Sequence, residues 1–123
     1  MPAPGVAAAN PLAVEAGLEV LRAGGGAADA AVAVQAALGL VEPQSSGLGG
    51  GAFLLYYDAQ TGAITAFDGR ETAPAGATPG MFLDENGAPL SYQDAVTSGR
   101  STGVPGAVAM LGLVHSKHGR LPW

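Results

Sequence analysis

Two stretches near the start of the chain carry apolar residues at helical spacing. Asn10 and Pro11 open the first stretch, with residue types preferred at the N-cap and at the first helical position. Apolar residues then recur three or four positions apart, and charged residues share the opposite face. This pattern predicts an amphipathic helix over residues 11–23, which the glycines at 24–26 end.

The second stretch, residues 27–41, is apolar almost all round, and Asp29 and Gln35 are its few polar residues. A helix of this kind is buried, and its many alanines allow neighbouring elements to approach closely. Asp29 lies in the first turn, where the helix dipole favours a carboxylate. We therefore interpret Asp29 as a helix-end residue.

Two segments with strand character follow the helices. Residues 52–57 and 63–67 are apolar and partly aromatic or β-branched, and the residues between them have the length and the glycine of a hairpin loop. The first strand is apolar on both faces, which predicts a central strand covered on both sides. Because a two-stranded hairpin is not a complete sheet, further strands are expected from outside this segment or from a partner.

The rest of the chain is irregular before a last helix. Residues 69–103 contain three prolines and a turn signal, and a short helix is predicted near residues 91–96. The final helix is expected to begin at Pro105 and to be closed by Gly119. The order of two helices, a hairpin, an irregular stretch and a C-terminal helix predicts an α+β fold.

Composition excludes several classes of function. Of the 123 residues, 48% are apolar and only 12% are charged, which is not the composition of a disordered chain. The net charge is −5 and the five basic residues are scattered, so neither nucleic-acid binding nor polybasic docking to a membrane is expected. The longest apolar run, residues 30–41, is too short for a membrane span.

The absence of cysteine excludes disulfides, thiolate catalysis and cysteine-based zinc sites. No signal peptide is expected in this chain, because residues 1–5 lack a charged region and a long apolar stretch. These observations leave the compartment open.

A glycine-rich loop at residues 47–51 formally fits the dinucleotide-binding pattern G-x-G-x-x-A when it is read through Ala52. That pattern binds dinucleotides when it follows a strand and opens a helix, whereas here it follows a helix and opens a strand. We instead expect its glycines to let the backbone pass close to another element or to a substrate. They are Gly47, Gly49, Gly50 and Gly51.

Arg70 follows the second predicted strand directly. An arginine at a strand end presents a planar fork that suits a carboxylate of a ligand. Local reasoning leaves a second interpretation open, an ion pair with Asp68 or Glu71, because most charged neighbours are structural.

His115 and His118 lie three positions apart in the last helix, which is a spacing compatible with a metal site. Without a third ligand nearby, a role at the helix C-terminus is favoured, and no metal site is predicted. The serines lack a recognisable base or the context of a nucleophile elbow. They are Ser45, Ser46, Ser98 and Ser101.

Several motifs together resemble those of γ-glutamyltransferases, also called γ-glutamyltranspeptidases or glutathione hydrolases. They occur in the family's order and at its approximate spacing, and they cover nearly the whole chain. The motifs are NPLA at 10–13 with GLEVL at 17–21 and GGGAADAAVA at 24–33, PQ at 43–44 with GLGGGAF at 47–53, FDGRETAP at 67–74, AT at 77–78 with MF at 81–82, and GVPGAV at 103–108.

The resemblance implies an N-terminal-nucleophile fold, an αββα sandwich made by a precursor that cleaves itself into a large and a small subunit. It implies that the new N-terminal Thr of the small subunit attacks the γ-glutamyl carbonyl, with its own α-amino group as base. Residues 1–123 would then be the incomplete N-terminal segment of such a domain. Neither the catalytic Thr, nor the rest of the large subunit, nor the small subunit would be in this chain.

For this chain the resemblance implies that Arg70 anchors the α-carboxylate of a γ-glutamyl substrate such as glutathione. Glu71 and the 47–51 loop are supporting candidates, and no catalytic residue, metal or cofactor is implied here. Gly69 stands where many family members have Phe or Tyr, which predicts an altered wall beside the carboxylate. The family is often periplasmic or extracellular.

Two alternatives remain beside the γ-glutamyl enzyme. Cephalosporin (glutaryl) acylases share much of the motif pattern and the same fold. The isolated segment is alternatively a non-catalytic fragment that supplies packing or an interaction surface.

Overall fold

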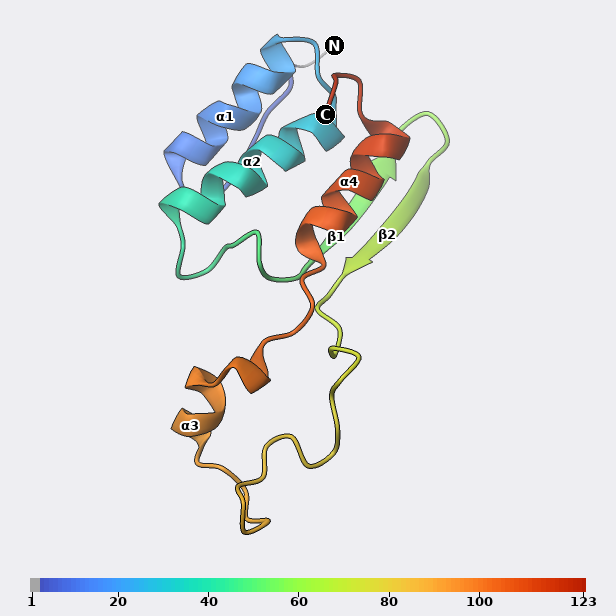
Figure 1. Cartoon of the computed structure of the whole chain (residues 1–123). Helices are drawn as coiled ribbons and strands as arrows, with labels where there is room; N and C mark the ends of the chain where they lie inside the picture. Colours follow the sequence, from blue (N-terminus) through green and yellow to red (C-terminus); the bar gives the residue numbers. More distant parts are fainter. Residues whose placement is uncertain (1–2) are drawn as a thin grey trace.

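The computed structural model describes residues 3–123 and contains four α-helices and one antiparallel hairpin (Figure 1). Met1 and Pro2 lie outside the described residues, and so does that part of the expectation about a signal peptide. The element bounds agree with the predicted ones to within two residues, so the predicted order is confirmed. The elements are α1 (Pro11–Arg22), α2 (Ala27–Val41), β1 (Ala52–Asp58), β2 (Ala63–Gly69), α3 (Tyr92–Thr97), a 3-10 turn (Gly99–Ser101) and α4 (Ala107–His118).

Helices α1 and α2 lie side by side (Figure 1). The Asn10 side chain accepts a hydrogen bond of 3.0 Å from the Leu12 N–H, as expected of an N-cap residue. At the start of α2, the Asp29 carboxylate accepts a hydrogen bond of 2.7 Å from the Gly26 N–H, which confirms its helix-end role. Among residues 3–123, no helix combines the length and the apolar character that crossing a membrane requires.

Strands β1 and β2 pair antiparallel, with Leu54 opposite Phe67, and both side chains face α4. Behind them lies a small core of buried residues from α2, β2 and α4, and Val32, Ala52, Leu54 and Tyr56 pack against it. The buried residues of this core are Ala28, Phe67, Met110, Leu111 and Val114.

The other face of the hairpin is open. Phe53, Leu55 and Tyr57 are 70%, 74% and 62% exposed, and Ile64 on β2 is 69% exposed. The prediction that the first strand is covered on both sides is therefore wrong for this chain by itself. The physical reason is that the helices of residues 3–123 pack on one face of the hairpin only (Figure 1).

Residues 73–103 form a lobe that projects away from the helices and the hairpin (Figure 1). Its base is a two-stranded neck in which Thr72 and Val104 exchange backbone hydrogen bonds of 3.3 and 2.9 Å. The lobe is irregular apart from α3, the 3-10 turn and short bridges, as the sequence predicts.

Candidate functional site

Arg70 lies at the first position after β2, where the hairpin meets the neck of the lobe. Its backbone N–H donates a 2.9 Å hydrogen bond to the Asp68 carboxylate, and its Nη1 donates a 2.7 Å hydrogen bond to Oε2 of Glu71. The ion pair with Glu71 is therefore present, yet the Arg70 side chain is still 66% exposed. Pairing with Glu71 leaves the guanidinium accessible to a ligand.

The exposed guanidinium borders a cavity of about 400 Å³ between the neck and the lobe. The neck supplies Arg70 and Glu71, and the lobe supplies Met81, Phe82 and Arg100 among others. Arg70 thus faces a cleft and is not locked inside the fold.

The end of β2 is held by the start of α4, and glycine at position 106 makes this contact possible. A Cβ atom on Gly106 would lie 2.7 Å from the carbonyl carbon of Gly69 and 2.8 Å from the Arg70 carbonyl oxygen. Gly69 is buried against Met110 of α4 and is not among the residues that line the Arg70 cavity. Gly69 thus contacts α4 and does not border the Arg70 cavity, and its effect on the wall beside the carboxylate stays a prediction.

The glycine loop lies next to both the start of α4 and Glu71. The Gly50 carbonyl oxygen accepts hydrogen bonds of 3.2 and 3.1 Å from the N–H groups of Gly106 and Ala107, which satisfies donors at the first turn of α4. Gly47, Gly50 and Gly51 border a second cavity of about 360 Å³. The loop therefore approaches another element closely, as predicted.

Gly49 takes no part in these contacts. It does not line the second cavity, and a Cβ atom there would meet nothing within 4 Å.

Glu71 stands between the two cavities and lines both of them. A Cβ atom on Gly51 would lie 2.8 Å from the Glu71 Cδ, and one on Gly103 would lie 2.9 Å from the Glu71 Cβ. Two glycines thus form a narrow slot around Glu71. Because the slot leaves this side chain little freedom, the carboxylate that pairs with Arg70 is held in place.

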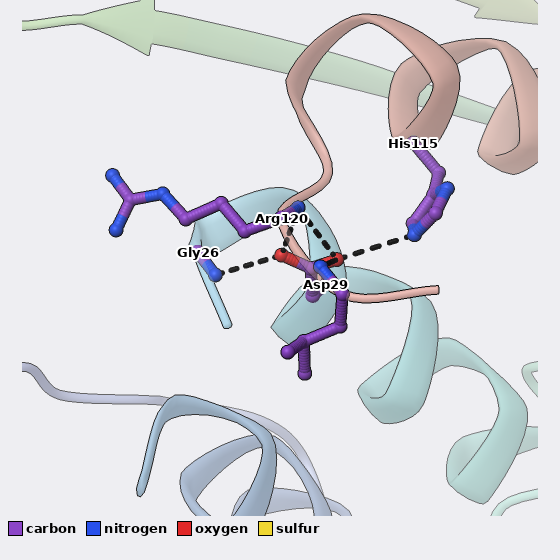
Figure 2. A network of polar contacts seen from close by, with 5 residues as sticks. Gly26, Asp29, His115 and Arg120 are labelled. Atoms are coloured by element: carbon purple, nitrogen blue, oxygen red, sulfur yellow. Dashed lines mark hydrogen bonds and ion pairs between the residues drawn. The ribbon is translucent and has the colours of Figure 1, made fainter. Parts of the chain in front are cut away.

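A separate polar network joins the start of α2 to the end of α4 (Figure 2). The Asp29 carboxylate, whose side chain is only 4% exposed, lies 3.2 Å from Nε2 of His115. It also accepts hydrogen bonds from the N–H groups of Arg120, at 3.0 Å, and Leu121, at 3.3 Å. Asp29 is therefore a tertiary anchor as well as a helix-end residue.

The surroundings of Asp29 act on its pKa in opposite directions. Burial raises this pKa, whereas backbone hydrogen bonds and the nearby His115 lower it, and the net effect holds the pKa of Asp29 below its ordinary value. The backbone donors are Gly26, Arg120 and Leu121.

The histidines of α4 point to different partners. His115 contacts Asp29, whereas His118 stacks on Tyr56 with ring centres 3.9 Å apart. Within residues 3–123, no three His, Asp or Glu side chains come together as a metal-binding group. Three of the four serines have a local structural role, since Ser46 accepts a hydrogen bond from Gln35, and Ser98 and Ser101 donate hydrogen bonds to backbone carbonyls of the lobe.

Two features of this region are not apparent in the sequence. One is the link between Asp29 and the turn after α4, whose partners lie 91 and 92 positions away in the chain. The other is Arg100, which shares the cavity of Arg70 and which sequence reasoning counted only as one of the scattered basic residues.

Comparison with known proteins identifies close relatives of the chain. The family model for gamma-glutamyltranspeptidase matches residues 13–123. The chain is 55% identical over 103 residues to the glutathione hydrolase proenzyme of Bacillus subtilis (strain 168), which covers 84% of this chain and 18% of that protein. It is 45% identical over 117 residues to the glutathione hydrolase proenzyme of Escherichia coli (strain K12), which covers 95% of this chain and 20% of that protein.

Solved structures agree with these relatives. The gamma-glutamyltranspeptidase of Pseudomonas nitroreducens, solved with L-DON, superposes with a TM-score of 0.88 at 34% identity and covers 100% of this chain and 36% of that one. The cephalosporin acylase of Bacillus halodurans gives a TM-score of 0.72 at 33% identity and covers 92% of this chain and 20% of that one. The chain thus spans about a fifth of the length of the Bacillus subtilis and Escherichia coli glutathione hydrolase proenzymes.

Proposed function

Because this chain belongs to the gamma-glutamyltranspeptidase family, we propose that it is the N-terminal segment of an enzyme that hydrolyses or transfers γ-glutamyl groups. We call that longer protein the complete enzyme. Its donors are γ-glutamyl amides such as glutathione. The observation that carries the proposal is the exposed Arg70 guanidinium, held at a strand end and bordering a cavity.

In this proposal Arg70 binds the free α-carboxylate of the donor. A guanidinium fork matches the two oxygens of a carboxylate, and hydrogen bonds to charged groups contribute about 1.5–3 kcal/mol each. An ordinary peptide amide carries no carboxylate at that position, so Arg70 selects a free amino-acid end. Glu71, fixed between Gly51 and Gly103, keeps the guanidinium oriented toward the cavity.

The catalytic nucleophile of the complete enzyme lies outside this chain. The family resemblance supports an N-terminal Thr, freed by self-cleavage, whose hydroxyl attacks the γ-glutamyl carbonyl with the α-amino group as base. Water or an acceptor amine then resolves the acyl-enzyme. This chemistry uses no metal or organic cofactor.

We also propose that the elements of this chain are one part of an αββα sandwich. The open face of the hairpin would pack against the rest of the large subunit and the small subunit. The motivating observation is the row of exposed apolar side chains on that face, which would otherwise remain in water. In this view the isolated segment is inactive and supplies packing and the Arg70 site.

A second candidate is a cephalosporin (glutaryl) acylase, which the superposition with the Bacillus halodurans enzyme favours. A glutaryl donor resembles a γ-glutamyl donor without the α-amino group. The γ-glutamyl hypothesis has more support, because the chain superposes on the transpeptidase with a TM-score of 0.88 and on the acylase with a TM-score of 0.72.

The test is to assay the complete enzyme with γ-glutamyl anilide and with glutaryl anilide, two donors that differ only in the α-amino group. We expect kcat/KM for the γ-glutamyl donor to be at least tenfold higher. Higher turnover of the glutaryl donor would replace the first proposal by the acylase. Absence of turnover with both would refute the enzyme reading.

A further inference from the structure

Two of the five basic residues of this acidic chain border the same cavity. Arg70 comes from the end of β2, and Arg100 comes from the 3-10 turn Gly99–Ser101 in the lobe. The cavity therefore has a cation on the neck side and another on the lobe side. Arg70 is assigned above to one carboxylate of the donor, which leaves Arg100 without a role.

Arg100 differs from Arg70 in how its charge is balanced. Its Nη1 donates hydrogen bonds of 3.2 Å to the backbone carbonyl oxygens of Met81 and Leu83, both of which are neutral. No carboxylate of residues 3–123 lies within ion-pair distance of Arg100, whereas Arg22 and Arg70 each pair with a glutamate. The positive charge of Arg100 is thus uncompensated by the part of the chain that is described.

The two carbonyl bonds also fix Arg100 in place. They use one amino group of the guanidinium, and the remaining N–H groups donate to no atom of residues 3–123. Thr102 also lines the cavity beside it, whereas the Ser101 hydroxyl already donates to backbone carbonyls of the lobe. A guanidinium that is fixed in place and keeps unused N–H donors suits a carboxylate ligand.

We propose that Arg100 binds a second carboxylate of the donor, so that the cavity selects γ-glutamyl compounds carrying two carboxylates over those carrying one. γ-Glutamyl peptides that end in a free carboxyl group belong to this class. The inference rests on the proposed function, in which Arg70 takes the first carboxylate. Because Arg100 is exposed, its attraction is partly screened by water, and we expect a preference of about 3- to 10-fold.

The test compares γ-glutamylglycine with γ-glutamylglycinamide, which differ only in the second carboxylate. In the complete enzyme, we expect the KM for the acid to be about 3- to 10-fold lower than that for the amide. Arg100→Gln retains an N–H donor for the carbonyls but removes the charge, and it should abolish the preference. Arg100→Lys retains the charge and should preserve part of it. Raising the salt concentration should weaken the wild-type preference.

A purely structural Arg100 would behave differently. Arg100→Gln would then impair both donors equally or lower the melting temperature of the complete enzyme, and either result with the preference intact would overturn the inference. If neither donor is turned over, the proposed function fails, and calorimetric binding of the same two compounds then tests Arg100 separately. Equal binding of acid and amide by the wild type would overturn the inference in that case too.

Discussion

Replacing Arg70 with alanine should affect binding of the γ-glutamyl substrate and not the stability of the fold, because this side chain has a small part in the fold. It is 66% exposed, and the ion pair that it makes with Glu71 lies at the surface. Exposed pairs contribute about 0–1 kcal/mol to stability. A hydrogen bond from the Arg70 guanidinium to the carboxylate of the γ-glutamyl substrate contributes about 1.5–3 kcal/mol, which corresponds to roughly a 10- to 100-fold change in affinity. The variant should therefore lose binding far more than stability.

The assay is steady-state hydrolysis of γ-glutamyl anilide by the complete enzyme, together with thermal unfolding. We expect the KM to rise about 10- to 100-fold while the melting temperature changes little. Arg22→Ala is the matched control, since Arg22 is also exposed and pairs with a glutamate on its own segment, and it should leave KM unchanged. A KM for Arg70→Ala within twofold of the wild type would refute the reasoning. A fall in melting temperature large enough to explain the lost activity would refute it as well.

Three further predictions concern the fold of the chain. Gly106→Ala should lower the free energy of unfolding in urea by about 1–3 kcal/mol, because the added Cβ would lie 2.7 Å from the Gly69 carbonyl carbon. Gly112→Ala is the control and should not destabilise the fold, because its Cβ would meet nothing within 4 Å. The lowered pKa of Asp29 means that its stabilising contribution is present above the ordinary pKa near 3.8 and is lost as pH falls through the lower folded value. Stability below about pH 4 should therefore fall more steeply in the wild type than in Asp29→Asn. The isolated chain should self-associate through the open face of the hairpin, and Leu55→Lys should reduce its mass by light scattering; an unchanged mass would contradict that assignment.

Local patterns were enough to predict the helices and strands of this chain. Asn10 caps α1 through its own side chain, and Asp29 accepts a hydrogen bond from Gly26 at the start of α2. Each signal acts within a few residues of the element that it delimits, so it can be recognised in the sequence without knowing the fold.

What could not be predicted depends on residues that are distant in the chain. Asp29 meets Arg120 across 91 positions, and no periodicity reports such a contact. The apolar pattern of β1 indicated two buried faces, but this chain supplies a cover for only one. Arg70 was found from its position after a strand, whereas Arg100 became a candidate only when the lobe placed it at the same cavity.

The slot around Glu71 has a consequence for how this protein can change over generations. Gly51 and Gly103 come from segments about fifty positions apart, yet both are limited by the atoms of one glutamate. Replacing Glu71 would not relieve these contacts, because a Cβ atom on Gly51 would still lie 2.9 Å from the backbone N at position 71, and one on Gly103 lies 2.9 Å from the Cβ that every residue except glycine carries there. Both positions are therefore expected to stay glycine. The lobe is attached by the Thr72–Val104 bridge and can accept substitutions at its tip independently. New donor preferences should therefore arise by drift in the lobe, while the slot stays invariant.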